Sequence, residues 1–242
     1  MMRKCLVVGA NGGMGSAISN RLQKENFYVI GTYHNSSEQL SLYKEGKKIN
    51  LYYLDLLNPV FDHLKNGFFS GITDVIFTAG KESLNSIMTC SRSEMIEQYD
   101  ISVFSPLLII QNIILKHNCA LQNIVFISST AACSLNPSNG MYALTKACVC
   151  NLTKMLDLEL KDRGIRVNCI VPGWCETKMA ERVSKAKGIT IEEIKNGKIN
   201  HRLVQTEEIA EICLFLLSDR ARNIHGQFIG VDVPERRISH ET

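Results

Sequence analysis

Tyr142 and Lys146 are the side chains in this sequence that are best suited to acid–base chemistry. They stand four residues apart in Tyr142-Ala-Leu-Thr-Lys146, so on a helix they share one face. A lysine ammonium beside a phenol favours the phenolate and lowers the tyrosine pKa from about 10 toward neutrality. Ser129, thirteen residues earlier, could hydrogen-bond a substrate oxygen and stabilise developing charge. A Tyr-x3-Lys spacing alone more often marks two exposed residues on one helix, so it indicates a catalytic site only if other motifs of such a site are present.

A glycine-rich turn near the start of the chain accompanies it. Gly9-Ala-Asn-Gly-Gly-Met-Gly15 follows an apolar run and precedes a helical pattern. Glycines allow a sharp turn and close approach of a pyrophosphate, which the N–H groups of a helix N-terminus then bind. The spacing Gly9-x3-Gly13-x-Gly15 differs from the GxGxxG fingerprint. The alternative to a pyrophosphate-binding turn is a glycine-rich strand–helix connection that binds no ligand.

The second apolar run ends in Tyr33-His34-Asn35-Ser36, which has no acidic residue. An acidic side chain here would hold the ribose 2′-hydroxyl of NAD. His34, Asn35 and Ser36 would instead donate to a 2′-phosphate, which favours NADP over NAD, although the turn holds no Arg or Lys. The alternative is a helix N-cap by Ser36 or Ser37.

Short apolar runs alternate with longer helical patterns along the chain. The runs expected as strands are Cys5–Val8, Phe27–Tyr33, Ile49–Leu54, Asp74–Thr78, Asn123–Ser128, Arg166–Val171 and Gln227–Val231. The helices expected include Met14–Glu25, Ser37–Glu45, Pro59–Phe69, Ile101–His117, Met141–Asp162 and Glu207–Leu217. This alternation predicts an α/β fold, a Rossmann-like three-layer sandwich with a seven-stranded parallel sheet, in one domain spanning residues 1–242.

Composition narrows the class of protein further. The net charge of +3, without clustered Lys/Arg and interleaved aromatics, argues against nucleic acid. Nine scattered cysteines without a CxxC pair fit reduced thiols in the cytoplasm better than disulfides or a metal site. The first apolar run is too short for a signal peptide, and no segment is expected to span a membrane. The helices Ile101–His117 and Met141–Asp162 are apolar on more than one face, which favours a subunit interface over a deep groove in a monomer.

Together these motifs resemble the short-chain dehydrogenase/reductase family over essentially the whole chain. The glycine turn, Asp55-Leu56, Ala79-Gly80, Ser129, Tyr142-x3-Lys146 and Pro172-Gly173 fall in the family's order and spacing. His201-Arg-Leu, Thr206-Glu-Glu-Ile-Ala and Phe215-Leu-Leu-Ser resemble 3-oxoacyl-[acyl-carrier-protein] reductases. The resemblance implies a homodimer or homotetramer that reduces a carbonyl.

The resemblance also assigns roles to residues. Tyr142 is the general acid, Lys146 lowers its pKa and binds ribose, and Ser129 orients the carbonyl. Three further groups are implied to contact the cofactor. Gly9, Asn11, Gly13, Met14 and Gly15 line the pyrophosphate and ribose, Asp55 and Leu56 touch adenine, Ala79 and Gly80 pass under the cofactor, and Pro172, Gly173 and Thr177 hold the carboxamide side.

The chain departs from the family pattern at several positions. Val8 replaces a threonine, and Phe77-Thr78 lacks an asparagine that braces the sheet. Ser102 stands where an asparagine completes the proton relay, with a shorter reach. Asp232-Val-Pro replaces a C-terminal Asp-Gly-Gly that packs against a partner subunit.

Residues 178–202 are the expected substrate lid. They carry seven basic and three acidic side chains, which suggests an anionic small-molecule or carrier-bound acyl substrate, with a merely solvated helical lid as the alternative. The family's carrier-binding arginine is matched by Arg163, but a second basic position falls at Ala120. The first hypothesis is NADPH-dependent reduction of a 3-oxoacyl thioester. The others are an oxidoreductase of another ketone or alcohol, such as a sugar or secondary metabolite, and a non-catalytic dinucleotide-binding regulatory protein.

Overall fold

Seven parallel strands form one sheet at the centre of the computed structural model, which describes residues 2–34, 49–61, 68–116, 120–134 and 137–235. The strands are β1 (Lys4–Val8), β2 (Tyr28–Tyr33), β3 (Ile49–Tyr53), β4 (Asp74–Phe77), β5 (Asn123–Ile127), β6 (Arg166–Pro172) and β7 (Phe228–Val231). They are ordered β3-β2-β1-β4-β5-β6-β7. All seven predicted strands are confirmed to within one residue at each end. The order reverses between β1 and β4, which is where such sheets open a ligand crevice at their carboxyl ends.

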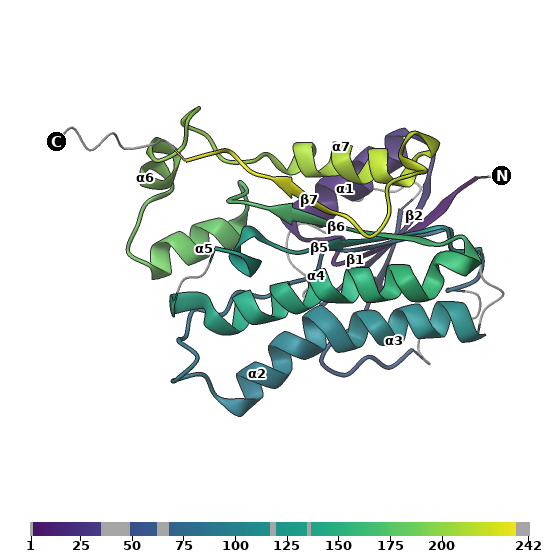
Figure 1. The fold of residues 1–242 in the computed structure, drawn as a ribbon, viewed down its shortest axis with the longest axis horizontal. Coiled ribbons are helices and arrows are strands. Elements are labelled where there is room, and N and C mark those ends of the chain that lie inside the picture. The colour runs from purple at the N-terminus through teal and green to yellow at the C-terminus, as the bar shows by residue number, and fades with distance from the viewer. Residues whose placement is uncertain (1, 35–48, 62–67, 117–119, 135–136, 236–242) are drawn as a thin grey trace.

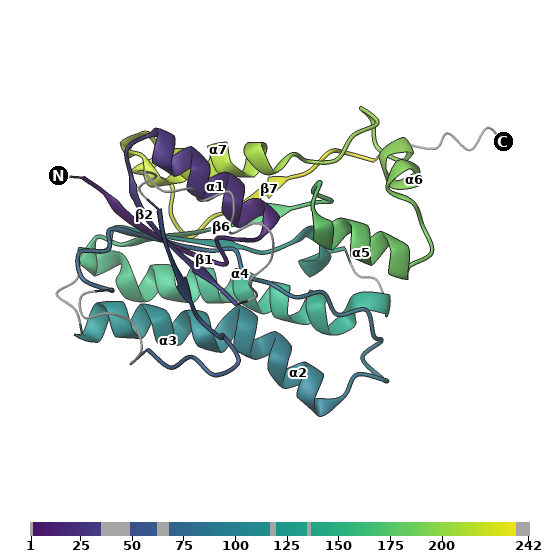
Figure 2. The same cartoon turned by 180° about the vertical axis from the view of Figure 1, so that it is seen from behind.

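Helices cover both faces of the sheet, so the predicted three-layer fold is confirmed (Figures 1 and 2). The helices α1 (Gly13–Lys24) and α7 (Thr206–Leu217) lie side by side on one face. The helices α2 (Arg92–Tyr99), α3 (Ser105–Gln111) and α4 (Gly140–Leu160) lie on the other. Two shorter helices, α5 (Lys178–Ala186) and α6 (Ile191–Asn196), project beyond the carboxyl ends of the strands, where the lid was expected.

The alternation of side chains along each strand divides the core into two halves. Leu6, Val8 and Phe77 face the α3–α4 side, whereas Cys5 and Val7 face the α1–α7 side. Successive side chains of a strand point to opposite faces, so a strand buried on both sides needs a continuous apolar run. This is why the strands could be predicted from uninterrupted runs of apolar residues.

The predicted helix Ile101–His117 is part of a longer helical rod. The rod begins at Arg92, where the Ser91 hydroxyl accepts the backbone N–H of Glu94 at 3.2 Å, and continues through two π-helical segments, Asp100–Phe104 and Asn112–Lys116. Its first turns are polar and carry no apolar stripe, so the sequence pattern missed them.

The rod also bears on the expectation that no segment spans a membrane. Residues 92–115 are long and apolar enough to cross a membrane, but half of their most apolar 18-residue window is buried inside the fold. The rod is therefore a core helix. The predicted helix Ser37–Glu45 lies outside the described residues. So does most of Pro59–Phe69, whose described ends, 59–61 and 68–69, are not helical.

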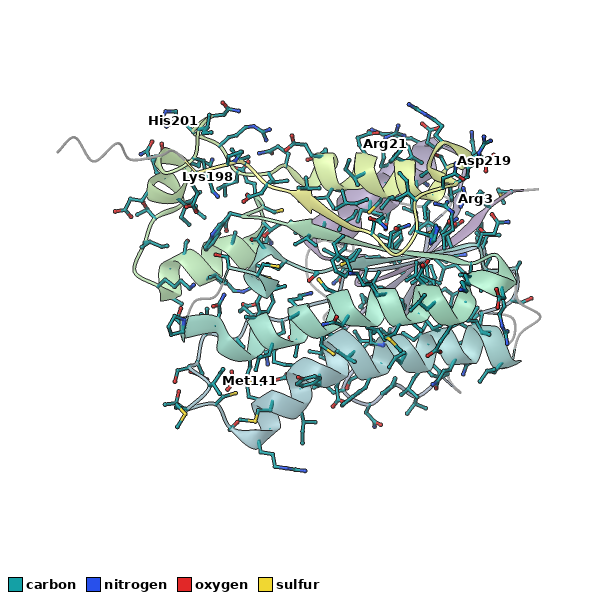
Figure 3. The ribbon with its side chains drawn as sticks, in the orientation of Figure 1. Arg3, Arg21, Met141, Lys198, His201 and Asp219 are labelled. Atoms are coloured by element: carbon teal, nitrogen blue, oxygen red, sulfur yellow. The ribbon has the colours of Figure 1, made fainter. Side chains whose placement is uncertain are left out.

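Polar contacts close the amino-terminal edge of the sheet. The buried carboxylate of Asp74 accepts the Arg3 Nε–H at 3.0 Å and the Asn123 amide at 2.7 Å. Arg3 and Asp219 lie at this end of the molecule, opposite Lys198 and His201 near the lid (Figure 3). A buried carboxylate needs such partners, so this edge is tied down while the opposite edge holds the cavity described below.

The cysteines of the described chain carry free thiols, most of them buried in the core. Within the same residues, no group of three His, Cys, Asp or Glu side chains is placed to hold a metal ion.

Candidate active site

The glycine turn joins β1 to α1 at the carboxyl edge of the sheet. Gly9 has a φ of +88°, and a Cβ there would lie 2.8 Å from the Ala79 backbone nitrogen. A Cβ on Gly15 would lie 2.1 Å from the carbonyl oxygen of Gly9. Both positions therefore require glycine, because a side chain would displace backbone rather than a flexible group. The turn leaves a cradle beside the N-terminus of α1, as an anion site requires.

Thr78 braces this turn from the neighbouring strand. Its hydroxyl lies 2.9 Å from the carbonyl oxygen of Val8 and 3.1 Å from that of Gly9. The hydroxyl takes over bracing at the position where the family pattern has an asparagine. The Thr78 hydroxyl thus partly compensates for the absence of the asparagine that braces the sheet in the family pattern.

The ends of β2 and β3 form the far end of the cavity. His34 Nε2 lies 3.7 Å from Asp55 Oδ1, and the His34 ring lies against Tyr53 with centroids 5.9 Å apart. The same Asp55 oxygen accepts the Leu57 backbone N–H at 2.9 Å. Tyr33, His34, Asp55 and Leu56 all line the cavity, whereas the predicted donors Asn35 and Ser36 lie outside the described residues.

The predicted catalytic residues meet where β5 ends against α4. Lys146 is buried, and its Nζ donates to the carbonyl oxygen of Ile127 at 2.9 Å. The Ser128 hydroxyl donates in return to the Lys146 carbonyl oxygen at 2.8 Å. Tyr142 lies one turn before Lys146, with its ring centroid 5.6 Å from Nζ, and is hydrogen-bonded to Ser129.

Burial controls the protonation of this group. It lowers the pKa of Lys146 from 10.5 to about 8. It also raises the pKa of Tyr142 above 10, against the hydrogen bond from Ser129, which lowers it. The net shift is therefore opposite to the expected lowering, because the effect of burial on the pKa of Tyr142 exceeds that of its hydrogen bond with Ser129. Tyr142 is a protonated phenol at neutral pH, the form that can give a proton to a substrate oxygen.

Ser102 lies behind this pair in the π-helical segment of the rod. Its side chain is buried and lines a small cavity together with Lys146, Ile127 and Ala79. Ser102 and Lys146 thus line the same small cavity. A π-helical turn at this point is typical of functional sites within helices.

The segment after β6 carries Pro172, Gly173 and Thr177. Thr177 lines the cavity and caps α5 by accepting the Ala180 N–H at 3.2 Å. A Cβ on Gly13 would lie 3.1 Å from Thr177 Cγ2, so the start of α5 stands directly over the glycine turn. Gly173 packs against the Asp232 carboxylate, which also lies 3.6 Å from the buried Nζ of Lys198.

One cavity of about 640 Å³ connects most of these residues. It runs from His34 past the glycine turn, Ala79 and Gly80 to Tyr142 and Lys146. All described candidates line this cavity except Ser102, Ser129, Pro172 and Gly173. Binding pockets typically measure roughly 300–1,000 Å³. The length of the cavity and the side-chain-free cradle at Gly9 and Gly15 fit a dinucleotide.

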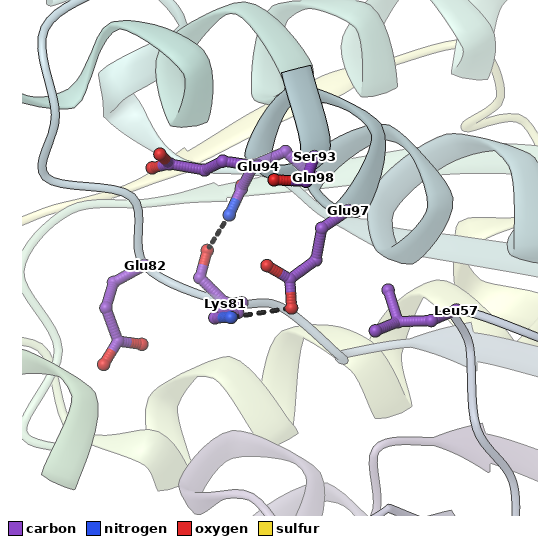
Figure 4. Close-up of a pocket in the computed structure, with 7 residues that line it drawn as sticks. All are labelled: Leu57, Lys81, Glu82, Ser93, Glu94, Glu97 and Gln98. Carbon is purple, nitrogen blue, oxygen red and sulfur yellow. Dashed lines mark hydrogen bonds and ion pairs between the residues drawn. The ribbon is translucent and has the colours of Figure 1, made fainter. Parts of the chain in front are cut away.

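Sequence reasoning did not single out Thr32, Lys81, Glu82, Glu97 and Ile101 of the cavity wall, whereas Met179 and Arg182 fall within the predicted lid, residues 178–202. Lys81 and Glu82 directly follow the predicted cofactor-binding residues Ala79 and Gly80 after β4. Their place in the sequence could therefore have predicted that they line the cavity. Lys81 Nζ lies 2.6 Å from Glu97 Oε1 and its carbonyl accepts from Gln98, beside a smaller hollow (Figure 4). Arg182 lies on α5 and pairs with Glu82 across the opening of the cavity.

Comparisons with known proteins agree with this geometry. The family model that matches residues 9–233 is described as enoyl-(acyl carrier protein) reductase. The chain is 29% identical to a 3-oxoacyl-[acyl-carrier-protein] reductase of Thermotoga maritima, over 94% of this chain and 95% of that one. It is 30% identical to the corresponding reductase of Salmonella typhimurium, over 94% of each chain.

Solved structures show the same fold. A short-chain dehydrogenase family protein from Francisella tularensis superposes with a TM-score of 0.83 at 24% identity, covering 96% of this chain and 97% of that one. The actinorhodin polyketide ketoreductase with NADPH superposes with a TM-score of 0.82 at 22% identity, covering 95% of each. The chain belongs to the short-chain dehydrogenase/reductase family. It is an oxidoreductase that uses a nicotinamide dinucleotide.

Proposed function

We propose that the protein reduces the ketone of a 3-oxoacyl thioester with NADPH, and that Tyr142 is the general acid. The observation that carries this proposal is the position of Tyr142, which is partly buried, hydrogen-bonded to Ser129 and in the lining of the cavity that also contains the glycine turn. The similarity to 3-oxoacyl-[acyl-carrier-protein] reductases over most of the chain supports the choice of substrate.

The residues divide the chemistry between them. The bound nicotinamide would supply the hydride for the carbonyl carbon. Ser129 holds the carbonyl oxygen by a hydrogen bond, and Tyr142 gives that oxygen its proton, so a ketone becomes an alcohol. The Lys146 ammonium, held near the ring, stabilises the phenolate that remains. Ser102 and the small cavity behind Lys146 form the route by which a proton returns.

The cavity supports a preference for NADP. His34 stands at the end of β2, where an acidic residue would select NAD, and it is half exposed toward the cavity. Asp55, the nearby carboxylate, is engaged by His34 and the Leu57 N–H. The glycine turn and α1 would hold the pyrophosphate. Ala79, Gly80 and Thr177 would border the rest of the cofactor, and Pro172 and Gly173 precede Thr177 at the end of β6.

The assembly we propose is a homodimer or homotetramer in the cytoplasm. Large apolar side chains are exposed on the helical rod and on α4: Phe104 (50%), Leu108 (45%), Leu115 (73%), Leu144 (45%), Met155 (55%) and Leu158 (59%). Apolar exposure on two neighbouring helices is typical of an interface. It matches the second apolar face predicted for both helices.

The experiment is NADPH and NADH oxidation with acetoacetyl-CoA, comparing wild type with Tyr142→Phe. NADPH-dependent turnover that falls by about 10²–10⁴ in Tyr142→Phe supports the assignment. Tyr28→Phe, at the start of β2, is the matched control and retains wild-type turnover. No turnover with either cofactor removes this substrate. Unchanged turnover in Tyr142→Phe removes Tyr142 as the acid.

A further inference from the structure

The opening of the cavity is bordered by one face of α5. Lys178, Met179 and Arg182 line the cavity, and their spacing places them on the same side of the helix. Thr177, which caps the helix, fixes this face over the glycine turn. Lys185, one turn further along, lies outside the lining and is exposed.

Arg182 is held in place by Glu82 from the loop after β4. Its Nε and one terminal nitrogen donate to the two carboxylate oxygens, at 2.5 and 3.1 Å. A guanidinium has five N–H donors, so this pairing leaves three of them. Among the described residues, the hydrogen bonds of this guanidinium come from Nε and Nη2, and none comes from Nη1. The pair thus fixes the position of the guanidinium without saturating it.

The pair is also weak enough to admit a ligand. The Arg182 side chain is 58% exposed, and exposed ion pairs contribute only about 0–1 kcal/mol. Glu82 points away from the Lys81–Glu97 pair in Figure 4, and Lys81 is hydrogen-bonded to Glu97 instead. Within the part of the chain that the structure describes, Lys178 has no acidic group within 4 Å, so this rim of the cavity is positive.

We propose that Arg182 binds an anionic group, a phosphate or a carboxylate, on the part of the substrate remote from the reacting carbonyl. The proposal rests on the proposed function and narrows the substrate class. The guanidinium fork is suited to either anion because it can donate two parallel N–H bonds. Lys178 adds to the positive potential at the rim, and Glu82 keeps the fork oriented before the ligand arrives.

The test compares substrates that differ only in charge. One pair is the 3-oxobutanoyl thioesters of pantetheine and of 4′-phosphopantetheine. The other is a 3-oxoacyl pantetheine thioester whose chain ends in a methyl group and its counterpart ending in a carboxylate. In the wild type, we expect kcat/KM to be about tenfold higher for the anionic member of one pair. A preference in the first pair identifies the phosphate of 4′-phosphopantetheine as the bound anion, and a preference in the second identifies a carboxylate at the end of the acyl chain.

The ratio of kcat/KM for the anionic substrate over its uncharged counterpart should fall to about one in Arg182→Gln. Arg182→Lys should keep part of this preference, because an ammonium has the charge but lacks the planar pair of N–H donors. Lys185→Gln removes the same charge from the same helix outside the cavity and should keep the full ratio. A wild-type ratio of one for both pairs overturns the proposal, and so does an unchanged ratio in Arg182→Gln or an equal loss in Lys185→Gln.

A binding measurement separates this inference from the proposed reaction. The chain has one tryptophan, Trp174, in the segment between β6 and α5, and its fluorescence reports binding of each thioester to the enzyme–NADPH complex. If the wild type turns over none of the thioesters, the proposed substrate fails. The ratio of Kd values then tests Arg182 by itself, with the same variants and the same expected outcomes.

Discussion

The Nζ atom of Lys146 donates to the carbonyl oxygen of Ile127, the last residue of β5. The next residue, Ser128, donates back to the Lys146 carbonyl oxygen. This reciprocal pair locks the catalytic turn of α4 onto the end of the sheet. It therefore fixes Tyr142, one turn away, relative to the cavity.

Burial of Lys146 makes stability depend on pH. The pKa falls from 10.5 in the unfolded chain to about 8 in the folded protein, so between these values only the unfolded chain retains the proton. The free energy of unfolding should thus rise with pH across this window. Relative to Lys146→Met, the wild type should gain about 3 kcal/mol between about pH 7 and pH 11, measured by urea denaturation. A constant difference between the two proteins would show that the lysine is not buried as described.

Gly15→Ala should abolish tight cofactor binding. Its Cβ would lie 2.1 Å from the Gly9 carbonyl oxygen, so the turn must shift, at a cost of about 1–3 kcal/mol in stability. Gly12→Ala is the matched control, because its Cβ would lie 3.4 Å from the same oxygen. Titration of NADPH fluorescence should show at least a tenfold weaker Kd for Gly15→Ala only. Equal effects at the two glycines would contradict the assigned geometry of the turn.

Thr78→Val tests the brace under the glycine turn. Valine keeps the shape and removes the hydroxyl that lies between the Val8 and Gly9 carbonyl oxygens. The expected loss is about 1–3 kcal/mol in urea unfolding, with weaker cofactor binding. Thr78→Ser retains the hydroxyl and should lose less. If Thr78→Ser were as destabilised as Thr78→Val, methyl packing rather than the hydrogen bonds would explain the position.

His34→Asp tests cofactor choice. A carboxylate at the end of β2 accepts from a ribose 2′-hydroxyl and repels a 2′-phosphate. The ratio of kcat/KM for NADPH over NADH should fall by at least about tenfold, which corresponds to about 1.4 kcal/mol. An unchanged ratio would mean that other residues select the cofactor.

Assembly can be tested on the exposed apolar side chains. Leu108→Glu combined with Leu158→Glu should give a smaller species by light scattering, because both leucines are about half exposed in one chain. Their burial in an interface would make a charge there costly. Two substitutions at Met2 and Ile189, exposed elsewhere, should leave the mass unchanged. A wild-type protein that is already monomeric would rule out the assembly.

Much of the fold could be predicted because β1 and β4–β6 are buried on both faces and read as continuous apolar runs. Tyr142, Lys146 and the glycine turn follow from short-range spacing, which a sequence displays directly. The rod's first turns, Arg92–Tyr99, could not be found, since they are polar and begin at a cap rather than at an apolar stripe. The pKa of Tyr142 was predicted in the wrong direction, because burial depends on packing by distant segments.

Thr177 stands within van der Waals reach of the position a side chain at Gly13 would occupy, and Thr177 also begins α5. The same helix therefore borders both the cofactor's cradle and, through Arg182, the substrate's entrance. Withdrawal of α5 would uncover the two ligands together, so its opening would set the residence time of the dinucleotide as well as the release of the alcohol.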